Sequence, residues 1–480
     1  MLRAFANLGL GAAVGLFSYA IGVGLTGSPL GGIGIAVVAT LIGTTWLLPK
    51  LRIEESACPT WLKVLSGMAT VLAILLVGRL SVFMLDASRP GASLVPSSTW
   101  EVQHSCLSAY YVAADAIRTK PNVYDNALYT APDDDPAKPR KALMLGPFKI
   151  DVFEYPPPFL LLPRALLAVT PDFLDMRRLW FGLNGLVMLA AFVVLAHALG
   201  PAAGTRALLL SPLIWLAPGT LSTLQKGNVQ VVVVAISMLA MLLFARGRPV
   251  AGSALLAFAI ASKLYPGLLV VYLIVRREWK AVAWTVAFGI GYGALTLAAF
   301  GWAPWQAFLT HFPGLMSGEA FPAFRNPMAM ANNLSIPGLV FKAKLWGAPG
   351  MGFPASKAVG WLYTIAALAA VVWAGRRSVV AEREPLVWLA ILILATLRSP
   401  FLPAAYGAVP AIWLITLIAA AWRAPGWSIA LGAPLFFYWP NDWPAEPKVI
   451  AAIALLPIAT MIAVSALALR GPRPGALKGP

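Results

Sequence analysis

Four clusters of polar residues interrupt a chain that is otherwise apolar almost from end to end. They are Ser105–Asp125, Asp151–Pro158, Leu224–Asn228 and Arg325–Ser335. A carboxylate can take the proton from a hydroxyl group, and a lysine or arginine can stabilise a departing phosphate. An apolar surface beside such groups would suit a lipid chain. These residue types therefore favour the transfer of a sugar from a lipid phosphate to a hydroxyl group, although their spacing does not show that they converge.

Lys263 is the cation whose position most favours a functional role. It lies in the segment Ser262–Pro266, which breaks a long apolar stretch. A lysine within a membrane is costly unless it is paired or hydrated, so we expect it to have a partner that matters to function. The third cluster has simpler alternatives, because Gln225 and Asn228 suit a helix cap and Lys226 suits an anchor at the membrane edge.

Several common kinds of catalytic site have no counterpart in the sequence. It contains no GxxxxGK[ST] phosphate loop, no HExxH or CxxC pair and no GxSxG turn. Histidine occurs only three times and cysteine twice. We therefore expect no metal, no cofactor and no bound nucleotide.

The composition is that of an integral membrane protein. Hydrophobic residues make up 59% of the 480 residues and charged residues only 11%, whereas soluble domains average about 25% charged residues. Apolar stretches recur from residue 7 to residue 469. We predict an all-α polytopic protein with one membrane domain over residues 1–480 and about fourteen transmembrane helices.

The net charge of +17 is distributed unevenly along the chain. The short connections 1–6, 49–63, 200–207, 245–250, 275–280, 376–386, 422–424 and 470–480 hold 17 Lys/Arg and 5 Asp/Glu, against 19 and 14 elsewhere. This asymmetry predicts that these connections are cytoplasmic, and it gives no reason to expect nucleic acid. Segments 86–177 and 301–354 are then extracytoplasmic loops. The apolar segment 159–170 would be only about 18 Å long as a helix, so we predict that it lies at the membrane surface.

Four fragments resemble glycosyltransferase family 87, membrane enzymes of the GT-C fold that include polyprenyl-phosphate-mannose-dependent mannosyltransferases. They are YYVAADAIRTKPNVYD from Tyr110, YPPPFLLLP from Tyr155, QKGNVQVVVVAI from Gln225 with the later KLYP turn at Lys263, and NNLSIPG from Asn332. The resemblance implies a GT-C-like bundle with interfacial helices. Together with the polar clusters, it predicts these substrate-binding residues: Tyr110, Tyr111, Asp125, Tyr155, Gln225, Lys226, Asn228, Lys263, Tyr265, Arg325, Asn332 and Asn333.

One departure from the family pattern concerns the general base. Such enzymes usually carry an aspartate about four residues before the first-loop tyrosine, where Cys106 or Leu107 falls in this chain. Either the activity differs or the base has moved, and the candidates for a moved base are His104, Asp115, Asp125, Asp151 and Glu154. Of these we favour Glu154, Asp151 and His104 almost equally. The two carboxylates keep the chemical type, and a histidine titrates near neutrality.

The resemblance implies an inverting glycosyltransferase in the bacterial cytoplasmic membrane, with its active site on the outer face. Its partners would be membrane lipid, a polyprenyl-phosphate-linked sugar and a glycolipid or glycan acceptor. Mannose is the sugar expected from the resemblance, and a pentose would also fit. The alternatives are a non-enzymatic polyprenyl-phosphate carrier or flippase, and an inactive scaffolding homologue.

Overall fold

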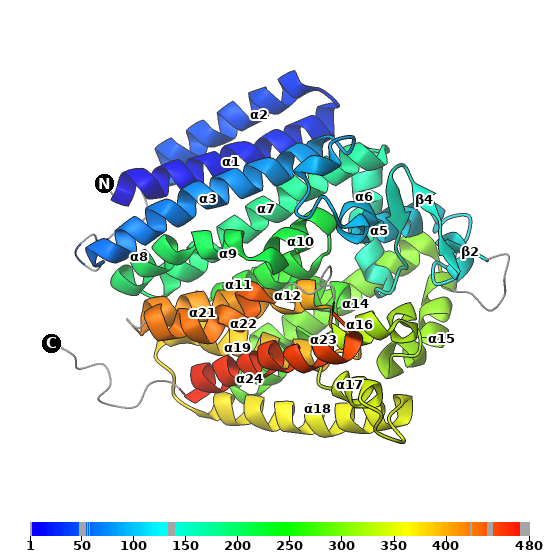
Figure 1. Ribbon diagram of the computed structural model, residues 1–480. Coiled ribbons are helices and arrows are strands. Elements are labelled where there is room, and N and C mark those ends of the chain that lie inside the picture. The colour runs from blue at the N-terminus through cyan, green and yellow to red at the C-terminus, as the bar shows by residue number, and fades with distance from the viewer. Residues whose placement is uncertain are drawn as a thin grey trace.

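The computed structural model describes residues 2–47, 54, 56, 58–132, 140–422, 425–438 and 445–470. These residues form a helical bundle with a small mixed region at one end (Figure 1). The predicted cytoplasmic connections 1–6, 49–63, 422–424 and 470–480 lie partly outside the described residues. Of the described helices, the following are long and apolar enough to cross a membrane: Asn7–Thr26 in α1 (Leu2–Thr26), α3 (Thr60–Leu85), α7 (Phe173–Ala198), α14 (Trp279–Phe300), α18 (Phe353–Arg376), Ala404–Ala421 and Pro447–Arg470.

The described residues thus contain seven candidate spans, or eight if one bent pair counts as a single span. Our estimate of about fourteen is not confirmed by this count. Several apolar helices have only 14 to 16 residues, and such helices are only about 21–24 Å long. These shorter helices are α2 (Pro29–Ile42), α11 (Gln230–Ala245), α12 (Pro249–Ser262) and α19 (Glu384–Leu397).

The remaining helices complete the bundle. They are α8 (Pro201–Leu210), α9 (Pro212–Leu216), α10 (Pro218–Lys226), α13 (Gly267–Val275), α15 (Ala303–Ser317), α16 (Pro327–Ala331), α17 (Leu339–Leu345), α20 (Ala404–Gly407), α21 (Val409–Ala421), α22 (Pro425–Phe437), α23 (Pro447–Ile453) and α24 (Leu455–Arg470), with short turns η1 (Gly43–Leu47), η7 (Pro322–Arg325) and η8 (Ala381–Arg383). The predicted break after Ser262 is confirmed, because α12 ends there and α13 begins at Gly267.

Apolar side chains cover the outside of several long helices. On α14 only 17% of the apolar window is buried, and Ile290 is 68% exposed. On α18, Leu362 and Ile365 are also largely exposed. A surface of this kind is stable against lipid rather than water, which agrees with the composition.

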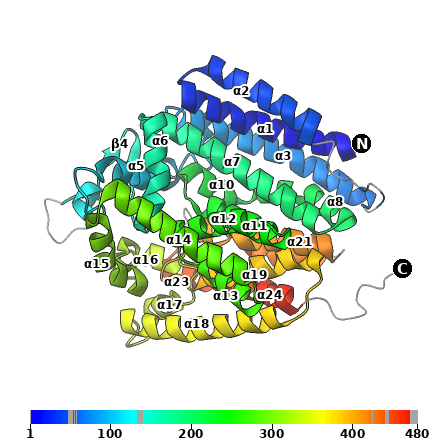
Figure 2. The ribbon, with the colours of Figure 1, turned by 180° about the vertical axis from the view of Figure 1, so that it is seen from behind.

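The first predicted loop folds into a compact unit between α3 and α7. It contains η4 (Pro90–Ala92), α4 (Thr99–Gln103), β1 (His104–Ser105), α5 (Cys106–Ala116), η5 (Asn126–Leu128), β2 (Thr130–Ala131), β3 (Lys141–Ala142), β4 (Met144–Leu145), β5 (Phe148–Ile150), η6 (Pro157–Leu160) and α6 (Leu161–Val169). This unit and α15, from the second predicted loop, lie at the same end of the bundle, as both views show (Figures 1 and 2). Segment 159–170 is confirmed as a short helix, and its place at the membrane surface stays a prediction.

A parallel pairing inside this unit brings two distant segments together. The strand order is β1-β5-β4, with His104 opposite Lys149 and Ser105 opposite Ile150. Since β5 ends at Ile150, the next residue, Asp151, emerges beside β1. The hydroxyl of Ser108 accepts the backbone N–H of Asp151 at 3.0 Å, which holds this junction.

The chain bends both before and after α10. These two bends bring the segment around Gly227 against the first-loop unit. Pro218 starts α10 at an angle of 62° to the preceding helices, because proline has no N–H to continue a helix. Gly227 then ends α10 in the left-handed conformation, with φ of 67°. A Cβ atom there would lie 3.0 Å from Cβ of Leu107, and the Gly227 carbonyl accepts the indole N–H of Trp180 at 2.9 Å.

We expect Gly227→Ala to lower the melting temperature of the detergent-purified protein. A left-handed alanine costs about 1–2 kcal/mol, and the methyl group would also press on Leu107. Gly247→Ala is the matched control, since Gly247 has φ of +69° with no atom near its missing Cβ. Equal melting temperatures for the two variants would contradict the crowding at Leu107.

Candidate functional site

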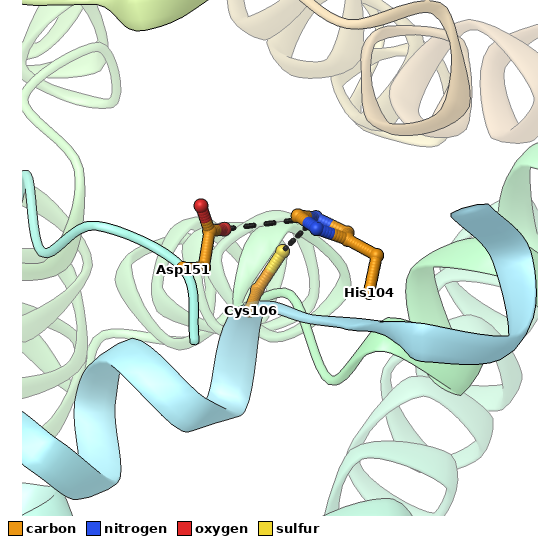
Figure 3. A group of neighbouring side chains, drawn as sticks. All are labelled: His104, Cys106 and Asp151. Atoms are coloured by element: carbon orange, nitrogen blue, oxygen red, sulfur yellow. Dashed lines mark hydrogen bonds and ion pairs between the residues drawn. The ribbon is translucent and has the colours of Figure 1, made fainter. Parts of the chain in front are cut away.

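His104, Cys106 and Asp151 form a cluster at the junction of β1, α5 and β5 (Figure 3). Nε2 of His104 lies 3.6 Å from Oδ2 of Asp151 and 3.5 Å from Sγ of Cys106. All three side chains point toward one another, and their ligand atoms lie within 4.8 Å of each other. The structure therefore places two of the three candidate bases beside the cysteine that stands where the family pattern expects an aspartate.

Aromatic and amide groups hold this cluster in position. The ring of Trp100 stacks on His104 with centroids 4.0 Å apart. The hydroxyl of Tyr406 lies 3.2 Å from Sγ of Cys106 and 3.3 Å from Nε2 of His104. The side-chain amide of Asn228 donates a hydrogen bond to the same sulfur at 3.3 Å.

The surrounding protein shifts the titration of these groups. Burial raises the pKa of the Asp151 carboxyl to about 6, although its side chain keeps 36% of its surface exposed. Burial, together with the charges of Lys226 and Lys149, holds the pKa of His104 well below its usual value. Burial also raises the pKa of the Cys106 thiol to about 12. All three shifts favour the uncharged forms in this partly dehydrated pocket of side chains.

A buried ion pair between Lys226 and Glu101 lies near the cluster. Glu101 was not among the residues predicted from the sequence. Nζ of Lys226 lies 2.6 Å from Oε1 of Glu101, and the two residues are 1% and 0% exposed. The other carboxylate oxygen of Glu101 accepts the hydroxyl of Ser222 at 3.1 Å. The Gln225 side-chain amide donates to the Glu101 carbonyl at 2.6 Å. Lys226 is therefore part of the interior, not an anchor at the membrane edge.

Glu154, the third candidate base, lies apart from these contacts. Its side chain is half-buried, and within the described part of the chain its carboxylate has no hydrogen-bond or ion-pair partner. Burial and the charge of Asp151 raise its pKa well above the usual value, and Lys263 opposes that shift. In its ionised form, a carboxylate of this kind is free to accept a proton from a bound molecule.

Lys263 meets Asn228 and Tyr155 next to Glu154. Its Nζ donates to Oδ1 of Asn228 at 3.4 Å and lies 5.8 Å from the centroid of the Tyr155 ring. The hydroxyls of Tyr155 and Tyr110 are 2.8 Å apart. These contacts join three of the four polar clusters that the sequence singled out.

The structure gives other predicted binding residues mainly structural contacts. Gln225 accepts the backbone N–H of Leu94 at 2.7 Å. The hydroxyl of Tyr111 donates to the carbonyl of Pro171, and Asp125 accepts the N–H of Ala127. Tyr265 lies in the break that holds Lys263, and Arg325 is exposed.

Asn332 and Asn333 act at a distance from the cluster. Oδ1 of Asn332 accepts the hydroxyl of Tyr438 at 3.1 Å. Oδ1 of Asn333 accepts the N–H of Leu402 at 2.8 Å, and its amide donates to the Pro400 carbonyl. These bonds fix the segment that leads into α20, which carries Tyr406.

Four residues of the site were not among our sequence candidates: Trp100, Glu101, Cys106 and Tyr406. A buried lysine requires a nearby anion. Once Lys226 is known to be buried, a carboxylate partner is expected, but the sequence does not identify that partner. Nothing in the local sequence singles out Tyr406, which lies 300 residues from Cys106. His104, Cys106 and Asp151 are the residues whose nitrogen, sulfur and carboxylate oxygen atoms could hold a metal ion.

A separate cavity of about 410 Å³ lies between the first loop and α15. Asn122, Tyr124, Gln306 and His311 are among its lining residues. The hydroxyl of Tyr124 donates to the Tyr155 carbonyl at 2.7 Å, so the cavity wall adjoins the segment that carries Glu154. None of the three candidate bases lines it.

We expect Glu101→Gln and Lys226→Met each to destabilise the protein by about 3–5 kcal/mol, because each leaves a buried group without its counter-ion. The double variant should lose less than the sum of the two single losses. Chemical denaturation in detergent measures this double-mutant cycle. Asp86 and Arg89 form the matched exposed pair, with side chains 46% and 68% exposed. Their cycle should show little coupling, and additive losses at Glu101 and Lys226 would contradict the buried pair.

Comparison with known proteins identifies the family. The family model for glycosyltransferase family 87 matches residues 153–400, just over half of the chain. No curated protein and no solved structure matches. The match includes Glu154, Lys226, Asn228 and Lys263, and it leaves out the His104 cluster. The chain therefore belongs to glycosyltransferase family 87, and it is a membrane glycosyltransferase.

Proposed function

We propose that this protein transfers mannose from a polyprenyl-phosphate donor to a hydroxyl group of a glycolipid or glycan acceptor, with inversion at the sugar. A pentose is the alternative sugar. The reaction would take place at the outer face of a bacterial cytoplasmic membrane. The observation that carries this proposal is the Glu154 carboxylate, which has no hydrogen-bond or ion-pair partner among the described residues and feels the charge of Lys263. It lies within the segment that matches the family.

Glu154 would act as the general base. It takes the proton from the acceptor hydroxyl while that oxygen forms a bond to the anomeric carbon. The bond between that carbon and the phosphate oxygen breaks, and its electron pair leaves with the polyprenyl phosphate. Inversion follows from this direct displacement, because the acceptor oxygen attacks the face of the sugar opposite the departing phosphate. No nucleotide takes part in these steps.

Lys263 is the best-placed cation for the departing phosphate. Lys226 is paired with Glu101 in the interior of the protein, and Arg325 is exposed and belongs to η7. Lys263 is half-buried, and its charge opposes the pKa shift of Glu154. A cation there would stabilise the negative charge that develops on the leaving phosphate.

The apolar surface of α14 offers a course for the polyprenyl chain. The η6 turn, which begins three residues after Glu154, packs against α12 and α14. Large apolar side chains of α14, including Ile290 and Leu295, are exposed along this helix. A lipid chain on that surface would place its phosphate near the segment Glu154–Pro157.

Turnover by the purified protein tests the proposed donor. Detergent-solubilised protein is incubated with radiolabelled polyprenyl-phosphate mannose, polyprenyl-phosphate pentose or the corresponding nucleotide sugars, together with a membrane lipid extract as acceptor. Label should move to the extract from a polyprenyl-phosphate sugar only. Transfer from a nucleotide sugar alone would overturn the proposal. Lipid binding or movement across vesicles without transfer would favour the carrier or the scaffold instead.

Glu154→Gln should lower the transfer rate by about 10²–10⁴-fold, because the amide cannot accept the hydroxyl proton. The melting temperature should change little, since the Glu154 side chain forms no hydrogen bond or ion pair with the residues that the structure describes. Glu319→Gln is the matched control, an identical change at an exposed residue of the second outer loop. A Glu154→Gln enzyme that kept the normal rate would exclude Glu154 as the base, and Asp151→Asn would then be examined.

Lys263→Met should lower kcat/KM for the donor by about 10–100-fold, because a charge-assisted hydrogen bond to the phosphate is lost. Lys263→Arg keeps the charge and should retain most of the activity. Lys357→Met, at an exposed position of α18, should behave as the unmodified enzyme does. Equal losses in the methionine and arginine variants would speak against a charge effect.

A further inference from the structure

We propose that His104, Cys106 and Asp151 bind one zinc ion through Nε2, Sγ and a carboxylate oxygen. The sequence led us to expect no metal, because it contains no HExxH or CxxC pair and only three histidines. The parallel pairing of β1 with β5 is what brings Asp151 to the other two. With His104 and Asp151 bound to the ion, Glu154 is the candidate base that remains.

The separations of the three donor atoms fit a tetrahedral ion. Zinc–ligand bonds of about 2.0–2.3 Å place neighbouring donors about 3.3–3.6 Å apart. Nε2 of His104 lies 3.5 Å from Sγ of Cys106 and 3.6 Å from Oδ2 of Asp151. The third separation is within 4.8 Å, and Asp151 is exposed enough to adjust. Little movement is therefore needed to bind an ion.

The chemical types of the donors select zinc. Magnesium and calcium prefer oxygen ligands only, whereas a thiolate, an imidazole and a carboxylate together suit zinc. Three protein ligands leave the fourth position open, as in catalytic rather than structural zinc sites. A thiolate and a carboxylate also balance the charge of the ion, which matters in a site of low hydration.

The neighbouring residues are those expected around metal ligands. Tyr406 and Asn228 contact the sulfur at 3.2 and 3.3 Å, and both can donate hydrogen bonds to a thiolate. Trp100 stacks on the imidazole and fixes its plane. Contacts of this kind orient ligands and strengthen binding. Lys226 and Lys149 are the cations that face His104, and Glu101 neutralises the first of them.

The open position would take an oxygen ligand from a substrate. If the proposed function holds, a phosphate oxygen of the donor is the natural candidate, because the side chain of Asn228 contacts both Sγ of Cys106 and Nζ of Lys263. This step rests on the proposed function, but zinc binding does not. Metal content and sugar transfer are therefore measured separately, and either can fail without the other.

The test uses the full-length protein in detergent, purified without a histidine tag. The protein is stripped with a chelator, dialysed against Zn²⁺, and its zinc is counted by mass spectrometry. We expect about one zinc per chain. A second sample loaded with Co²⁺ should show the near-ultraviolet absorption of a cobalt–thiolate bond, which reports on Cys106 without any activity assay.

Single substitutions locate the ion. His104→Ala, Cys106→Ser and Asp151→Asn should each lower the affinity for Zn²⁺ at least about 100-fold, and Tyr406→Phe should lower it about 10-fold. Cys58→Ser and His311→Ala are the matched controls, at the other cysteine and at a histidine outside the cluster. Melting curves show which variants are folded. Wild-type protein with neither zinc nor the cobalt band, or full zinc in all three cluster variants, would overturn the proposal.

Discussion

The buried ion pair between Glu101 and Lys226 is the contact on which the arrangement of the site depends. Two charges without water are stable only when each faces the other with good geometry. The pair therefore requires the start of the first loop and the end of α10 to meet in one register. Once they meet, His104 follows Glu101 by three residues and Asn228 follows Lys226 by two. The buried ion pair thus sets the positions from which the His104 and Asn228 side chains extend.

Local features of the fold were predictable from the sequence because their causes are local. The break around Lys263 follows from the proline in that segment, and it is confirmed. The membrane class followed from composition. The number of spans was not predictable in the same way, because the 16 residues of α11 are as apolar as a span but form a short, buried helix. Apolarity reports burial, and it does not distinguish lipid from protein as the surroundings.

The site itself was predictable only in part. Glu154, Lys226, Asn228 and Lys263 belong to motifs that the family match covers, so sequence comparison could find them. The cluster of His104 with Asp151 could not be found, because strands of two or three residues carry almost no pattern. Glu101 resembles an ordinary acidic residue in the first turn of a helix. Its burial becomes clear only when Lys226 is placed opposite.

The contact between Cys106 and Tyr406 has a consequence for how the protein is made. The two residues are separated by 300 positions, so the ribosome has delivered most of the chain before they can meet. The first loop must already be on its final side of the membrane and wait there while later helices insert. A nascent chain that stops before α20 lacks the tyrosine that closes the cluster. The contacts of the cluster are therefore completed only near the end of biogenesis.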